Sequence, residues 1–159
     1  MTIPVSTAPA AAAYLLTEIT TAVATDPATI LVKLGEPGRN RPDDMILIGE
    51  VQRNVKEQSF VGSGGAGWLG EEYEQHITIG SWQANGDVYN ESTQALQVNA
   101  RAWQLIAYVE AVVRADPSLG GLVEVAYPMQ TTSSGPTWTT DPVGLLVSVN
   151  LPIRIEATI

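Results

Sequence analysis

Apolar and polar positions alternate most regularly near the end of the chain. The odd-numbered positions from 143 to 155 are all apolar, without a break. This period of two predicts a long strand that buries one face. Pro152 cannot donate a backbone hydrogen bond, so we expect that part of the strand at an edge or a bulge. Residues 123–127 alternate in the same way and predict a shorter strand, and the Gly, Ser, Thr and Pro residues of 130–142 predict a loop between the two.

A second region of alternation predicts a long β-hairpin. Apolar residues alternate with polar ones over residues 45–60, and their parity changes at Gly49, where a bulge is expected. Alternation is present again over residues 73–79. The two strands are joined through residues 61–71, which predict a loosely structured hairpin tip.

The first part of the chain predicts a helix followed by a strand. Apolar residues at i, i+4 and i+8 predict a helix over about residues 9–25, which Asp26 and Pro27 end. The β-branched run at 28–35 predicts a strand. The turn formers and charges at 36–44 predict an exposed loop.

A longer helix is predicted from its cap at Asn90 to a position before Pro117. One apolar stripe consists of Val98, Ala102, Leu105, Val109 and Val112. A second patch consists of Leu96, Ala100 and Trp103. Two apolar surfaces exceed what packing on one sheet requires, so either the first helix or a neighbouring subunit is expected to cover the second. The segments "AVATDPATILV" and "VVRADPSLGGLVEV" also resemble each other, through duplication or through independent use of the same turn chemistry.

Together these elements predict an α+β fold. We expect a mostly antiparallel sheet of about four to five strands, with two helices packed on one face and a long hairpin arm. A length of 159 residues fits a single domain, 1–159.

Composition favours a protein that assembles with partners. Charged residues make up 16% of the chain, against about 25% in a typical soluble domain, so partners are expected to cover part of the surface. The net charge of −9 argues against tight nucleic-acid binding. The chain has no cysteine, which excludes disulfides and thiolate metal sites. That lack of cysteine is compatible with a reducing cytoplasm, and because the alanine-rich start lacks the features of a signal or membrane segment, we expect neither secretion nor a membrane segment.

The glycine-rich stretch "FVGSGGAGWLGEEYE" does not have the features of a phosphate-binding loop. No lysine and hydroxyl follow its last glycine, and the carboxylates behind it repel phosphate. The favoured interpretation is a mobile hairpin tip in which Trp68 anchors a contact that orders on binding.

Titratable residues predict neither catalysis nor a metal site. His76 is the single histidine and is interpreted as a solvated strand residue. The groups Glu71, Glu72 and Glu74, and Asp43 and Asp44, lack the spacing of a calcium loop and are interpreted as a solvated acidic rim. No serine has the context of an activated nucleophile. We therefore expect no catalytic residue, no cofactor and no metal.

The order of elements resembles the tail terminator (neck or tail-completion) proteins of long-tailed, non-contractile bacteriophages. The resemblance is carried by "EEYEQHITIGSWQANGD", "ARAWQLIAYVEAVVRADPSLGG" and "VGLLVSVNLPIRIEATI", and it spans roughly residues 10–159. It implies a structural virion protein that forms a ring, usually of six copies, assembled in the host cytoplasm. The ring would cap the tail tube, join it to the head connector protein, and contact DNA only in passage through an acidic lumen.

The resemblance also suggests where contacts with neighbouring subunits or the tube lie. By position these are the loop at 39–44 and the surroundings of the hairpin tip. The candidate residues are Arg39, Arg41, Asp43, Asp44, Trp68, Glu71 and Glu72. Two alternatives stay open: another neck, connector or minor tail protein of the same virion, and a small ligand-binding module or cofactor-free enzyme.

Overall fold

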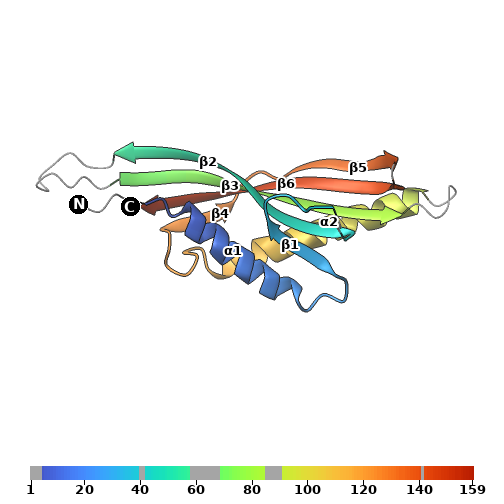
Figure 1. Ribbon diagram of the computed structural model, residues 1–159, viewed down its shortest axis with the longest axis horizontal. Helices are drawn as coiled ribbons and strands as arrows, with labels where there is room; N and C mark the ends of the chain where they lie inside the picture. The colour runs from blue at the N-terminus through green and yellow to red at the C-terminus, as the bar shows by residue number, and fades with distance from the viewer. Residues whose placement is uncertain (1–4, 40–41, 58–68, 85–90, 141) are drawn as a thin grey trace, which may run out of the picture.

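The alternating segments form one six-stranded open sheet, and both helices cover the same face of it (Figure 1). The computed structural model describes residues 5–39, 42–57, 69–84, 91–140 and 142–159. The helices are α1 (Ala8–Val23) and α2 (Glu91–Ala115). The strands are β1 (Ile30–Leu34), β2 (Asp44–Glu57), β3 (Leu69–Ala84), β4 (Val125–Pro128), β5 (Thr132–Thr140) and β6 (Val143–Thr158). The predicted α+β class is confirmed, with six strands in place of the expected four to five.

The sheet has the order β1-β2-β3-β6-β4, and β5 pairs with β6 next to β4. All neighbours are antiparallel except β1 and β2, which are parallel. The 16-residue strands β3 and β6 form the middle of the sheet. Strands β2 and β3 extend beyond the helices as the predicted hairpin arm (Figure 1). Its expected tip at 61–71 lies mostly outside the described residues.

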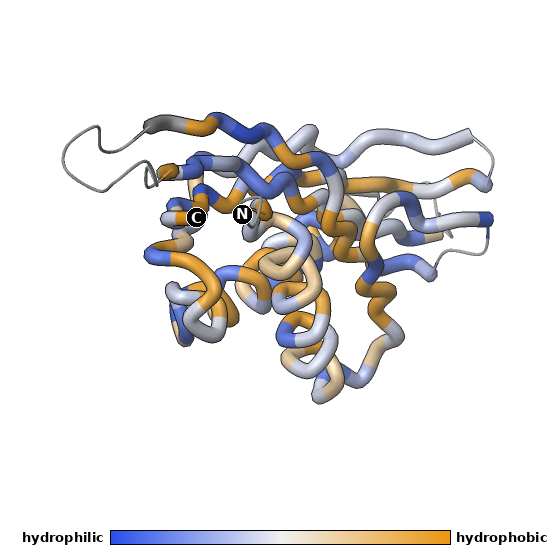
Figure 2. The backbone as a smooth tube through the Cα atoms, turned by 60° about the vertical axis from the view of Figure 1, so that its left-hand side comes forward, coloured by the Kyte–Doolittle hydropathy of each residue, from blue (hydrophilic) through white to orange (hydrophobic). Residues whose placement is uncertain are grey.

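The predicted apolar face of β6 packs against the helices. Its odd positions from Leu145 to Ala157 are buried, whereas Val143 at the start of the strand is 56% exposed. Figure 2 shows how apolar segments of the sheet and helices face each other. Pro152 lies where β4 ends and β5 begins, and its carbonyl accepts a 2.8 Å hydrogen bond from the Met129 N–H. The Pro152 nitrogen, which has no hydrogen to donate, thus lies at the gap between β4 and β5. The expected edge position is wrong, because β6 lies inside the sheet.

The segment predicted as a loop at 130–142 is wrong in part, because it contains strand β5. Its alternating Thr and Ser residues pair with β6 from Thr132 to Thr140. The register shifts between Ser133 and Pro136, and Gly135 there has a φ of 69°. A strand at the side of the sheet tolerates this proline because its other side has no ladder to interrupt.

The expected bulge at Gly49 is confirmed by a register shift between Ile48 and Val51. The buried Gln75 side chain stabilises it from β3. Its Nε2 donates to the carbonyl of Gly49 at 2.9 Å and to that of Glu50 at 3.3 Å. A side chain thereby replaces the ladder hydrogen bonds that the bulge removes.

Helix α2 packs its predicted stripe on the sheet, with Val113 buried and Val112 half-buried at its end. The second apolar patch is not covered by α1. Leu96 is 72% exposed and Trp103 46% exposed. Of the two expected covers, α1 is therefore ruled out within the described residues, and a neighbouring subunit stays a prediction.

The two Asp-Pro turns are linked reciprocally. Tyr14 of α1 donates its hydroxyl to Asp116 after α2, and Tyr108 of α2 donates to Asp26 after α1, both at 2.9 Å. Hydrogen bonds from the Ser118 hydroxyl, the Gly120 N–H and Tyr14 lower the pKa of Asp116 to about 2. Each turn therefore accepts a hydrogen bond from the opposite helix.

Candidate functional site

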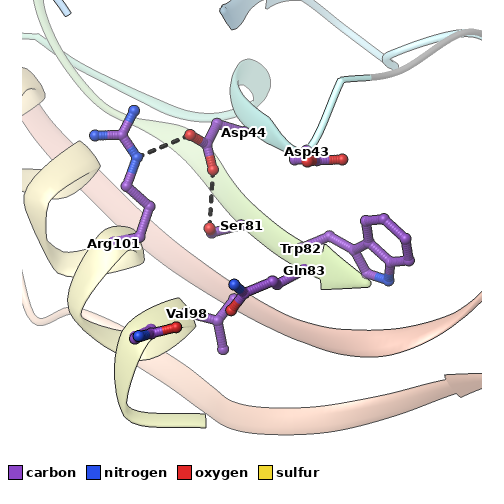
Figure 3. Close-up of a pocket in the computed structure, with 8 residues that line it drawn as sticks. Asp43, Asp44, Ser81, Trp82, Gln83, Val98 and Arg101 are labelled. Carbon is purple, nitrogen blue, oxygen red and sulfur yellow. Dashed lines mark hydrogen bonds and ion pairs between the residues drawn. The ribbon is translucent and has the colours of Figure 1, made fainter. Parts of the chain in front are cut away.

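The first candidate site is a shallow depression of about 290 Å³ between the start of β2, the end of β3 and α2 (Figure 3). It is lined by Asp43, Asp44, Ser81, Trp82, Gln83, Gln97, Val98 and Arg101. Asp43 and Trp82 extend away from the Asp44–Arg101 pair in Figure 3. A ligand would therefore meet mixed polar and aromatic groups in an open hollow.

The charge of Arg101 at this hollow is fully engaged within the chain. Its Nε donates to Asp44 at 2.8 Å, and its two terminal nitrogens each donate to Asp26 at 2.8 Å. Ser81 donates to the other oxygen of Asp44 at 2.9 Å. The Arg101 hydrogen bonds, with one from the Ala28 N–H, hold the pKa of Asp26 well below its usual value. This cluster ties α2 to the turn after α1 and to β2, which is a structural role.

A second depression, of about 280 Å³, is lined by residues of β2, β3 and β6. Arg154 of β6 lies 2.7 Å from Glu72 and 3.5 Å from Glu74, and its Nε is 4.0 Å from Glu156. Its single positive charge is thus shared among three carboxylates. Such a cross-strand group stabilises strand pairing but leaves little positive charge for an anionic ligand.

Glu71 corrects the expectation of a solvated acidic rim, because it is 1% exposed. Its Oε1 accepts from the N–H and the hydroxyl of Thr7, both at 2.6 Å, and its Oε2 accepts from Arg53 at 2.6 Å. Burial alone would raise the pKa of Glu71, but the hydrogen bonds from Thr7 and Arg53 outweigh it and lower the pKa. The carboxylate therefore anchors the start of α1, where the helix dipole favours negative charge.

The remaining candidate contacts fall into three groups. Arg39 and Asp43 are exposed, whereas Asp44 is buried in its bond to Arg101, and Glu72 is half-buried beside Arg154. Arg41 and Trp68 lie outside the described residues. Asp44 and Glu71 thus bond within their own chain. The contact role of all seven residues stays a prediction.

His76 is half-buried on β3, with Nδ1 beside the Asn150 amide and Nε2 3.8 Å from Glu74. Across the described ranges, no three His, Asp or Glu side chains are grouped so that they could hold a metal ion. Within the same part of the chain, neither helix has the length and apolarity needed to cross a membrane.

Sequence reasoning missed the exposed apolar side chains along the last part of the sheet. Tyr127 lies on β4 and Trp138 on β5, and Leu122 and Met129 lie just outside β4. Three more lie on β1 and β2: Leu34, Val51 and Val55. The signal was present in the absence of charge from residue 125 to residue 140, which is unusual for an exposed segment.

No family model and no curated protein matches the chain. Among solved structures, the chain is similar to the sheath/tube terminator of an extracellular contractile injection system, PVC, in its extended state. The identity is 16% and the TM-score 0.40, over 100% of this chain and 58% of the other. The chain therefore spans less than two thirds of the length of that protein.

Proposed function

We propose that this protein is a structural, non-enzymatic virion component that forms a ring of six copies. The ring caps the tail tube of a long-tailed bacteriophage and joins it to the head connector. The resemblance of the sequence to tail terminators supports this role, and so does the negative net charge, which disfavours retention of DNA in a channel.

The observation that carries the proposal is the contrast between charged and apolar side chains in the described residues. Apart from the exposed Asp43, the charged groups at the two depressions are engaged in ion pairs within the chain. Large apolar side chains are instead exposed on both sides of the sheet and on the outer face of α2. Apolar surface that is left exposed to solvent in this way is typical of a protein that binds other proteins.

The test is co-assembly with a phage tail-tube protein. Native mass measurement and negative-stain microscopy are carried out on the chain alone and with assembled tubes. Rings, free or seated on tube ends, are expected. A chain that stays monomeric and does not bind tube ends would overturn the proposal. A ligand-dependent rise in melting temperature of such a monomer would instead support the ligand-binding alternative.

A further inference from the structure

We infer that copies of this chain associate head to tail through the two opposite edges of the open sheet, the β2 side and the β5 side. This inference rests on the ring proposed above. The β2 side comprises β1 and residues 50–57 of β2, which run past the end of β1. The β5 side comprises residues 122–140, including β4 and β5. In the described part of the chain, each side ends in strand segments with one paired neighbour (Figure 1).

The β5 side has the composition of an interface. Residues 125–140 contain no charged side chain. The large apolar residues exposed along it are Leu122, Tyr127, Met129 and Trp138, the last of which is 48% exposed. Free sheet sides are usually protected by charges, whereas the centres of interfaces are depleted in charge and enriched in Tyr, Trp and Met. This side is therefore built to be covered.

The β2 side also exposes apolar side chains, Leu34, Val51 and Val55. By contrast, among the described residues of the central strands, β3 exposes no large apolar side chain and β6 exposes Val143 alone. Apolar exposure on the sheet is thus concentrated at its two sides. Pro136 and the register shift before it interrupt β5, so we expect the contact to form through side chains more than through a continuous backbone ladder.

Charge favours pairing of unlike sides. On the β2 side and in the neighbouring residues 35–43, exposed residues of both signs occur: Lys33, Arg39 and Arg53 are basic, and Glu36, Asp43 and Glu50 are acidic. The β5 side has exposed Glu124 at its start, and no basic residue occurs between Arg114 and Arg154. In a chain of net charge −9, only the unlike pair therefore places these basic residues opposite a side that has none of its own, whereas two β2 sides would bring basic residues against basic ones.

The strand register places the two sides at the same height. Lys33 lies opposite Leu47, which lies opposite Thr78, and Thr78 and Thr132 both lie opposite Asn150. Lys33 and Thr132 therefore mark one level across the full width of the sheet. A contact between unlike sides is heterologous, and it closes into a ring when the rotation between copies is a whole fraction of a turn.

Cysteine cross-linking tests the contact directly, because the chain has no cysteine of its own. One preparation carries Lys33→Cys, and a second, with a mass tag, carries Thr132→Cys. They are mixed and treated with a short bismaleimide. Cross-links between unlike preparations are expected to exceed those within either one by at least tenfold. Equal yields, predominance of like pairs, or no cross-link at all would overturn the inference.

Substitution of Trp138 tests the energetics. Trp138→Ser is expected to weaken self-association at least tenfold, as measured by mass photometry over a concentration series. The matched control is Trp103→Ser on the outer face of α2, which is equally exposed but lies off both sides. Trp138→Ser should weaken self-association more than Trp103→Ser does, and the reverse order would overturn the inference. Tyr127→Ser provides a second variant on the β5 side if Trp138→Ser lowers the melting temperature.

The outcomes also separate this inference from the proposed function. Rings that form on tubes with Trp138→Ser as readily as with the wild type would overturn the head-to-tail contact and leave the proposed function standing. A wild-type chain that forms oligomers with unlike cross-links but does not bind tubes would uphold the contact and overturn the tube-capping role. A monomer whose β5-side variants lose tube binding would assign that side to the tube and overturn the inference.

Discussion

Replacement of Glu71 by Gln is expected to destabilise the protein through the start of α1. Glutamine keeps the size of the side chain and one acceptor oxygen for Thr7. Its NH₂ group, however, would face the Arg53 Nε, from which Glu71 now accepts a hydrogen bond. A hydrogen bond to a charged group contributes about 1.5–3 kcal/mol. Because Arg53 is 36% exposed and water can solvate it, we reduce that range, and the expected loss is about 1–2 kcal/mol.

The effect of pH follows from the lowered pKa of Glu71. A carboxyl group whose pKa is lower in the folded than in the unfolded protein stabilises the fold above the unfolded pKa, about 4.3 for Glu. That contribution is lost as the pH falls below this value toward the folded pKa. The difference between wild type and Glu71→Gln should therefore be largest at pH 7 and should shrink on acidification to pH 3.

The measurement is urea unfolding of both proteins at pH 7 and pH 3, followed by circular dichroism. Glu74→Gln is the matched control, since this carboxylate on the same strand is 28% exposed and 3.5 Å from Arg154. The control should change the unfolding free energy by less than about 1 kcal/mol. A Glu71→Gln variant as stable as the wild type at pH 7, or a difference that persists undiminished at pH 3, would refute the anchoring role.

Three other substitutions test the interior. Gln75→Leu should cost about 1–3 kcal/mol in urea unfolding because it leaves the bulge carbonyls without donors, whereas Gln52→Leu on the exposed arm should not. Gly144→Ala should cost about 1–3 kcal/mol, since a Cβ there would lie 2.5 Å from a carbonyl oxygen of β3. The tolerant counterpart is Gly49→Ala, whose nearest contact would be 3.7 Å. Arg101→Met should lower the melting temperature more at pH 7 than at pH 3, because it removes the cation that holds down the pKa of Asp26, and acidification then neutralises the unpaired carboxylate; an equal loss at both pH values would contradict this.

The elements that could be predicted are those whose apolar residues repeat over many positions. The long β6 strand, the α2 helix and the parity change at Gly49 all depend on local periodicity, which the chain displays directly. Strand β5 was missed because its alternation lies between polar residues, Thr and Ser, and carries no contrast in hydrophobicity. Strand β5 forms because it pairs with β6, and the sequence of β5 itself carries no local signal of that pairing.

The buried charges show a different limit. Glu71 has the parity of the buried Tyr73 and Ile77, and Asp44 that of the buried Ile46, so alternation alone could have indicated that both face the helices. Their partners could not be found in this way. Asp26 lies 75 positions from Arg101, and Thr7 lies 64 positions from Glu71. Only the packing of both helices on one face brings these groups together.

The interior and the surface of this protein therefore use polar groups in opposite ways. Although the chain has few charges, several of them link elements inside the fold. Arg101 links α2 to the turn after α1 and to β2, and Glu71 links β3 to the start of α1. These links fix the helices on the sheet, so that the two edges of the sheet hold their shape without a bound partner. A rigid side that carries Tyr127 and Trp138 and has no charge over residues 125–140 binds a partner with little ordering cost. This is the physical reason to expect that the β5 side, and not the charged hollow at Arg101, is where the protein meets its neighbours.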